Sequence, residues 1–241
     1  MNVVLIDLDE TLSDHRHSSQ AGIRTLWQEH PALQQKTVEA LEHEFWIMLD
    51  SMHSEVLKGN LTLEQARVER FRRLFAGCGQ ELAEREIDAL TERYQAAYRR
   101  SRRAVPGAHE LLRWLREQGA KIVVVTNGFT SVQQGKLREC AMEGLVDHLL
   151  TSEAAGAQKP ERSVFEAALQ LAGGTPERAV MIGDSWQSDV TGAAQLGIKA
   201  FWLNRREETC PDPALAVEIG DLSQLPELLS AHWHTLKNGC V

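Results

Sequence analysis

Short apolar runs alternate with amphipathic stretches along most of the chain. The strongest runs are 3–6, 122–126, 180–182 and 200–203, with a weaker one at 149–151. Such short runs, each followed by polar residues, are typical of strands that a parallel sheet buries on both faces. Amphipathic helices are expected between them, around 108–118, from about 131, and at 161–172 and 187–196. The alternation predicts an α/β fold: a doubly wound parallel sheet with a Rossmann-like core.

Residues 15–102 follow a different pattern, with no convincing strand. Apolar side chains recur there at helical spacing, in the sets Leu41, Phe45, Met48, Leu49, Met52 and Ile87, Leu90, Tyr94, Tyr98. Thr62 can cap a further helix, and Gln65 can close a capping box with it. We therefore expect a helical insert over 15–102, interrupting an α/β core formed by 1–14 and 103–241.

Composition excludes several classes of protein. The chain has 241 residues, of which 43% are hydrophobic and 25% charged, so disordered, collagen-like and coiled-coil architectures are excluded. A net charge of −8 argues against nucleic-acid and anionic-membrane partners, but it allows a small anionic ligand. The four cysteines form no CxxC pair. No apolar stretch is long enough to suggest a membrane span, and no signal peptide is evident. These features favour a cytoplasmic protein with reduced thiols.

Polar side chains that can hold a cation or a phosphate directly follow three predicted strands: Asp7 and Asp9, Thr126 and Asn127, and Asp184 and Asp189. Carboxyl ends of parallel strands share one edge of a sheet, so these groups should converge. Lys159, before the helix at 161–172, can project toward the same edge. Each residue alone fits an ordinary cap or turn, but their joint occurrence at strand ends favours a coordinated site. Clustered carboxylates repel one another, and Mg²⁺ with a substrate phosphate would offset that repulsion.

The motifs DLDETL, TNG, KP and GDSWQSD, in this order, resemble those of the haloacid dehalogenase-like (HAD) hydrolase superfamily. The insert resembles the helical cap of the subgroup that carries its cap between the first two motifs. The stretch TNGFTSVQQGKL, with WLN after the last strong strand, is similar to the bacterial pyrimidine 5′-nucleotidase branch.

The resemblance implies a role for each motif residue. Asp7 would be the nucleophile, and Asp9 the general acid and base. The phosphoryl group would be bound by Thr126, Asn127 and Lys159. The Mg²⁺ ligands would be Asp7, Asp9 through its backbone carbonyl, and Asp184, with Asp189 supporting the metal shell.

These roles imply a Mg²⁺-dependent phosphatase that hydrolyses a small phosphomonoester through an aspartyl-phosphate intermediate, with a nucleoside 5′-monophosphate as one substrate class. A sugar phosphatase and a phosphosugar mutase are the enzymatic alternatives. A non-catalytic phosphate- or partner-binding module is the alternative of another class, and loss of Asp7 or Asp9 would mark it. The dehalogenases of the superfamily lack the acid/base aspartate. The expected partner is a small phosphorylated metabolite, with no nucleic acid and no membrane, for a monomer or homodimer.

Within the insert, Trp46 and Met48 are the candidates for contacts with the leaving group. An aromatic and thioether surface suits a nucleobase better than a hydroxyl-rich sugar. The alternative role, as part of the insert's own core, is the more common one for such side chains.

Overall fold

The computed structural model describes residues 1–238 and divides them into two compact units. One unit combines Met1–Asp14 with the chain from Arg103 onward, and the other is His15–Arg102. The first is an α/β unit and the second is entirely helical within the described residues.

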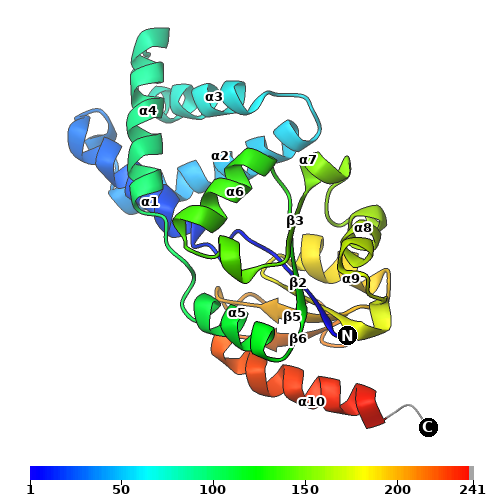
Figure 1. The fold of residues 1–241 in the computed structure, drawn as a ribbon. Helices are drawn as coiled ribbons and strands as arrows, with labels where there is room; N and C mark the ends of the chain where they lie inside the picture. The colour runs from blue at the N-terminus through cyan, green and yellow to red at the C-terminus, as the bar shows by residue number, and fades with distance from the viewer. Residues whose placement is uncertain (239–241) are drawn as a thin grey trace. The chain divides into compact units, whose positions relative to one another are not determined.

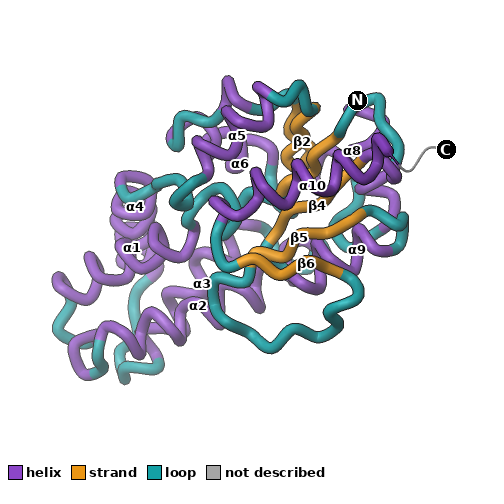
Figure 2. Tube along the Cα trace, turned by 90° about the horizontal axis from the view of Figure 1, so that it is seen from below, coloured by secondary structure: helices purple, strands orange, loops and turns teal. Residues whose placement is uncertain are grey.

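Within residues 1–238, six strands form one sheet in the order β3-β2-β1-β4-β5-β6. Figure 2 labels β2, β4, β5 and β6 of this sheet. The strands are β1 (Val3–Ile6), β2 (Lys121–Thr126), β3 (His148–Thr151), β4 (Ala179–Gly183), β5 (Lys199–Leu203) and β6 (Ala216–Ile219). Every neighbouring pair is parallel. The predicted α/β fold is therefore confirmed, and β1 lies in the middle of the sheet, where the strand order reverses direction.

Helices cover both faces of the sheet (Figure 1). On one face, α5 (Ala108–Glu117) and α10 (Leu225–Asn238) pack against Val4 and Ile6 of β1. On the other face, α8 (Arg162–Ala172) and α9 (Thr191–Ala194) pack against Val3 and Leu5. Side chains alternate between the faces along a strand. All four residues of β1 are consequently buried, as the run of apolar residues predicted.

Shorter helices complete the α/β unit. Two α-helices follow β2 and β3, namely α6 (Thr130–Glu139) and α7 (Ser152–Ala155). Single 3₁₀ turns occupy Glu143–Leu145, Pro176–Arg178 and Leu222–Gln224.

The structure differs from the predicted pattern at two places. The strand β6 was not expected, because it lies at the sheet edge, pairs with β5 alone, and leaves two of its four residues partly or fully exposed. It therefore lacks a continuous apolar run. The helix expected at 187–196 is a π-helix at Trp186–Val190 followed by the short α9.

The helical unit contains α1 (His15–Glu29), α2 (Val38–Leu57), α3 (Leu63–Ala76) and α4 (Glu84–Arg100), with a 3₁₀ turn at Leu33–Gln35. Its core is aromatic: the Phe45 ring centroid lies 5.6 Å from that of Phe71 and 5.0 Å from that of Tyr94. The helix α1 approaches α4 closely at Gly22, where a Cβ atom would collide with the Tyr94 ring.

The predicted capping box of the helical unit is confirmed at the start of α3. The Gln65 N–H donates to Thr62 Oγ1 at 3.0 Å, and the Thr62 N–H donates to Gln65 Oε1 at 2.8 Å.

The two connections between the units run side by side where they leave the α/β unit. The Asp14 N–H donates to the Arg103 carbonyl at 3.0 Å, and Arg103 Nε and Nη2 donate to Asp14 Oδ2 at 2.9 and 2.8 Å. Ser13 and Ala104 form a further antiparallel bridge. The chain therefore departs and returns at one place.

Two further features concern membrane spans and cysteines. No helix within residues 1–238 combines the length and apolar character that crossing a membrane would require. Cys78, Cys140 and Cys210 are free thiols, and Cys240 lies outside the described residues.

Candidate active site

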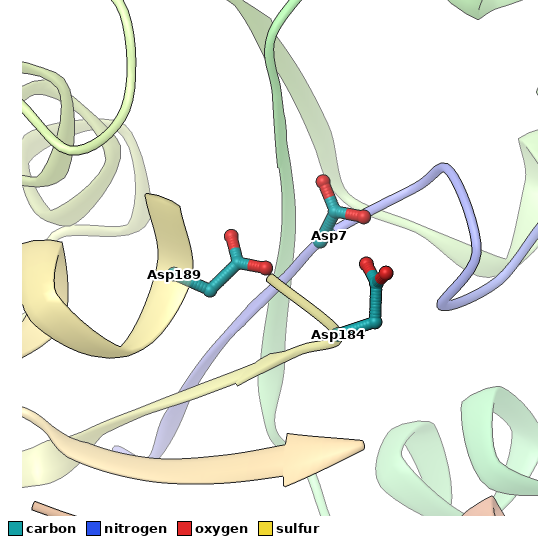
Figure 3. Close-up of side chains that lie close together, drawn as sticks. All are labelled: Asp7, Asp184 and Asp189. Atoms are coloured by element: carbon teal, nitrogen blue, oxygen red, sulfur yellow. The ribbon is translucent and has the colours of Figure 1, made fainter. Parts of the chain in front are cut away.

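Three carboxylates converge at the carboxyl edge of the sheet (Figure 3). Asp7 follows β1, Asp184 follows β4, and Asp189 lies in the π-helix after β4. One oxygen from each lies within 4.8 Å of the others. They meet because β1 and β4 are neighbours in the sheet, and the Asp7 N–H extends their ladder by donating to the Ile182 carbonyl at 2.9 Å.

Lys159 is the cation that two of these carboxylates share. Its Nζ donates to Asp7 Oδ1 at 2.6 Å, to Asp189 Oδ1 at 2.7 Å and to the Val125 carbonyl at 2.7 Å. Burial alone would lower the pKa of Lys159, but Asp189 and Asp7 outweigh that effect and raise it. The ammonium group therefore stays charged at the base of the site.

The charge of Lys159 does not balance the whole cluster. Burial is the main cause that raises the pKa of Asp7 to about 7, with Lys159 opposing it and Asp189 adding to it. Burial and then the repulsion of Asp7 and Asp189 raise the pKa of Asp184 well above its usual range. Ionised carboxylates at this edge are thus electrostatically strained, and an added cation would relieve the strain.

Neighbouring groups hold Asp189 and Asp184 in place. A side chain at Gly183 would collide with the Asp189 carboxyl group, so glycine is required there. The Ser185 N–H donates to Asp189 Oδ2 at 3.0 Å. The Asp184 N–H donates to Thr11 Oγ1 at 3.1 Å, and its carbonyl accepts a hydrogen bond of 2.8 Å from Trp202 Nε1.

Asp9 and Thr126 lie in a second polar group of the α/β unit. This group also contains Gln133 and Lys136, to which the sequence analysis gave no role. Lys136 Nζ donates to both carboxylate oxygens of Asp9 at 2.6 Å. Gln133 Nε2 donates to Thr126 Oγ1 at 2.7 Å and to Asp9 Oδ2 at 3.1 Å. Because the Thr126 hydroxyl accepts from Gln133, its own hydrogen is left to donate to a bound anion.

Asn127 holds the loop that carries Lys159. Its side-chain amide donates to the Lys159 carbonyl at 2.9 Å, and its Oδ1 accepts from the Lys159 N–H at 2.8 Å. The side chain of Asn127 thus positions the lysine backbone.

The model of the haloacid dehalogenase-like hydrolases matches residues 1–197 of this chain. The chain belongs to this family. Pyrimidine 5′-nucleotidase PynA of Streptococcus pneumoniae is 29% identical over 202 residues, which are 83% of each protein. Pyrimidine 5′-nucleotidase YjjG of Escherichia coli is 36% identical over 131 residues, which are 53% of this chain and only 57% of YjjG.

The fold of this HAD-like hydrolase is shared with a solved structure, the HAD-hydrolase YfnB of Bacillus subtilis bound to magnesium. The TM-score is 0.77 at 22% identity, and the match covers 95% of this chain and 98% of YfnB. The likeness extends over both the α/β residues and the insert, so it supports the architecture of a parallel sheet with an inserted helical cap.

Trp46 and Met48 both lie in the helical unit of this HAD-like hydrolase. Trp46 lines a pocket of about 190 Å³ within that unit, together with Arg16, Ser19 and His43. The Arg16 guanidinium carbon lies 5.5 Å from the centroid of the Trp46 ring. Met48 instead packs against the aromatic core.

Proposed function

We propose that this protein is a Mg²⁺-dependent phosphatase that hydrolyses a small phosphomonoester through an aspartyl-phosphate on Asp7. The observation that carries the proposal is the arrangement of Asp7, Lys159 and Asp184 at the carboxyl edge of β1 and β4. This arrangement offers a carboxylate nucleophile beside one fixed cation and one further oxygen ligand. Membership of the hydrolase family and likeness to proteins named as nucleotidases support the coarser statement, that it is a phosphoric monoester hydrolase.

In the first half-reaction, an Asp7 oxygen would attack phosphorus while the bond from phosphorus to the leaving oxygen breaks. Asp9, in its protonated form, would give its proton to that oxygen. In the second half-reaction, water would attack the phosphorus while the Asp7 oxygen leaves, and the Asp9 carboxylate would take the proton of that water. Inorganic phosphate is released, and Asp9 is protonated for the next turnover.

The phosphoryl oxygens would be held by three groups of the α/β unit. Thr126 would donate its hydroxyl hydrogen, Asn127 its backbone N–H, and Lys159 would offset the negative charge. Because Lys159 is fixed by two carboxylates and a carbonyl, it is already oriented before substrate arrives.

The donor set fits a magnesium ion. The groups that would hold it are the carboxylates of Asp7 and Asp184 and the backbone carbonyl of Asp9, all oxygen ligands of the kind that Mg²⁺ prefers. Asp189, buried against Gly183, would support the metal shell. When bound, the ion would supply positive charge to the carboxylate cluster and to the substrate phosphate.

For the leaving group, we propose a nucleoside 5′-monophosphate, with pyrimidine nucleotides preferred. PynA and YjjG are both named pyrimidine 5′-nucleotidases, and Trp46 of the helical unit offers an aromatic wall that a base could stack on. A sugar phosphate is the alternative substrate. The cytoplasmic location and the monomeric or homodimeric state stay predictions of the sequence.

The test is a panel of phosphorylated metabolites, assayed with Mg²⁺ by phosphate release, with p-nitrophenyl phosphate as the reference substrate. We expect pyrimidine nucleoside monophosphates to give a higher kcat/KM than hexose phosphates. A higher value for hexose phosphates would overturn the nucleotidase proposal and leave the phosphatase proposal standing. No turnover of any phosphomonoester, p-nitrophenyl phosphate included, would overturn both.

Trp46→Ala tests the pocket in the same assay. We expect it to narrow the difference in kcat/KM between nucleoside monophosphates and hexose phosphates. Turnover of p-nitrophenyl phosphate should stay within a few-fold, because the change affects leaving-group binding and leaves the chemistry alone. Met48→Leu, a change of similar volume against the aromatic core, is the matched control and should leave the ratio unchanged.

A further inference from the structure

Lys136 and Gln133 lie in the stretch TNGFTSVQQGKL, but the resemblance implies no role for either of them. Both are buried beside Asp9. We propose that they are positioning residues, which hold the Asp9 carboxylate in place for proton transfer and couple it to the phosphate-binding hydroxyl of Thr126. The inference rests on the proposed function, since it assigns a role to groups that act through Asp9.

Lys136 meets Asp9 at both carboxylate oxygens. Both distances are 2.6 Å. Burying an ammonium group is unfavourable unless an opposite charge compensates it. Lys136 is therefore held in its position by Asp9, and a two-point contact restricts the rotation of the Asp9 side chain in turn.

The exposure of the two partners is unequal. The Lys136 side chain is 6% exposed and that of Asp9 is 26% exposed. The amine thus supports the carboxylate from the protein side, and Asp9 keeps an accessible part. A carboxyl group that exchanges a proton with a leaving oxygen or a water must be held in place and must also be accessible to that oxygen or water.

Gln133 joins Asp9 to the phosphate-binding group. One amide nitrogen donates to both Thr126 Oγ1 and Asp9 Oδ2, at 2.7 and 3.1 Å. Its amide also packs against Gly128, where an added Cβ would lie 3.1 Å from the same nitrogen. Gln133 and Lys136 are three residues apart on α6, so one helix face carries both contacts.

The support of Asp9 should matter to a different extent for good and for poor leaving groups. If the Asp9 carboxylate loses its support, proton donation to the leaving oxygen and proton removal from water both slow down. A p-nitrophenolate leaving group needs little protonation, so its departure should be spared while hydrolysis of the aspartyl-phosphate is slowed. Phenolate is a poorer leaving group, so its departure should be slowed as well.

The test variant is Lys136→Met, assayed by rapid-mixing kinetics with p-nitrophenyl phosphate and phenyl phosphate in the presence of Mg²⁺. With p-nitrophenyl phosphate, we expect a burst of about one p-nitrophenolate per enzyme, then a steady rate about 10- to 100-fold below that of the wild type. With phenyl phosphate, we expect the slow rate without a burst. Lys136→Arg, which keeps the charge, should recover much of the rate.

Two further variants control the measurement. Lys121→Met removes a lysine of the same unit that pairs with Asp147 at 2.8 Å at the opposite end of β2, and it should behave as the wild type. In an Asp9→Asn background, Lys136→Met should cause no further loss, because the group that it positions is absent. The double variant removes both charges of the pair and so leaves neither one unpaired. It can therefore be compared with the Asp9→Asn enzyme even if Lys136→Met alone does not fold.

The inference is overturned if Lys136→Met keeps the steady rates with both substrates within threefold of the wild type. It is also overturned if the variant slows release of p-nitrophenolate and of phenolate equally, without a burst. It is also overturned if Lys136→Met slows the Asp9→Asn enzyme further. These outcomes leave the proposed function intact as long as Asp7→Asn and Asp9→Asn are impaired. An active Asp7→Asn enzyme would instead overturn the proposed function.

Discussion

Both units of this hydrolase have an apolar core, but they differ in the charged side chains that they bury. The α/β unit buries charged groups at the sheet edge: the Lys159, Asp7 and Asp189 side chains are 2%, 10% and 1% exposed. The helical unit buries aromatic rings, and its ion pairs, such as those of Glu69 with Arg72 and Arg73, stay near the surface. Arg70 is a buried cation of that unit, and its guanidinium carbon lies 5.7 Å from the centroid of the Phe45 ring.

The contrast separates what folding requires from what chemistry requires. Packing aromatic side chains away from water stabilises any compact unit. Burying carboxylates next to one another does the opposite, because desolvation and repulsion both oppose it. A buried like-charged cluster therefore indicates a function, and changes to it should alter activity before stability.

Asp7→Asn is expected to have the largest effect on activity. Turnover of p-nitrophenyl phosphate should fall by at least about 10³-fold, since the nucleophile is lost. Burial raises the pKa of Asp7, so the ionised group destabilises the metal-free fold above that pKa. Lys159 keeps its ion pair with Asp189 in the variant. At pH 8 and without metal, the Tm of the variant should therefore be no lower than that of the wild type. Residual activity within tenfold of the wild type would refute the role of Asp7.

Removal of the metal should abolish activity reversibly. We expect EDTA to stop turnover, Mg²⁺ to restore it, and Ca²⁺ to inhibit, because Ca²⁺ accepts up to eight oxygen ligands and loosens the geometry. Saturating Mg²⁺, at about 100 times its Kd, should stabilise the fold by about 2.7 kcal/mol, which thermal unfolding can measure. Asp184→Asn is the control and should lose most of this stabilisation. Full activity in metal-free buffer would contradict the prediction.

Phe45→Ala tests the aromatic core of the helical unit. Its ring is fully buried among aromatic neighbours, so its removal should cost about 3–5 kcal/mol of stability in the helical unit. Hydrogen exchange followed by mass spectrometry, peptide by peptide, would show faster exchange within 15–102. Phe45→Leu should have a much smaller effect. Unchanged exchange in that segment would mean that the aromatic cluster does not carry the stability of the unit.

Glu69→Gln should have the smallest effect. Hydrogen bonds from Arg73 and Arg72 lower the pKa of Glu69, but the three side chains are 29–61% exposed and solvent screens them. We expect the free energy of unfolding at pH 7 to fall by less than about 1 kcal/mol. A lowered carboxyl pKa stabilises the fold above the pKa of the unfolded state. The difference between variant and wild type should therefore vanish as the pH falls to about 3. A loss of several kcal/mol would show that a surface charge matters here as a buried one does.

The strands that the sequence predicted most strongly lie in the interior of the sheet. Of the two edge strands, β3 was predicted from a weaker apolar run and β6 was not predicted. Val3–Ile6 is apolar at every position because both faces are covered, and this pattern is legible without a structure. The edge strand Ala216–Ile219 has one neighbour and an exposed Glu218, so its sequence resembles a loop. Thr62 and Gln65 were predictable as a capping box because the contact is local, three residues apart.

The site was predictable where its residues directly follow strands. Asp7 and Asp184 stand at strand ends, and the sheet order alone brings them together. Lys136 stands two turns into a helix, where lysine is ordinarily a solvated residue. Its burial against Asp9 depends on how α6 lies on the sheet, which no spacing in the sequence encodes.

The hydrogen bonds between Asp14 and Arg103, here called the clasp, hold the two ends of the insert together. For the chain that forms the sheet, the insert therefore joins two neighbouring points, as a tight turn does. Loop-closure entropy depends on the distance between the ends of a segment and only weakly on what lies between them. Strand β1 must find β2 across more than a hundred residues of chain, yet the clasp lets the intervening helices fold as a separate body. The insert can therefore change in length and composition over evolution while the entropic cost of assembling the sheet stays nearly constant.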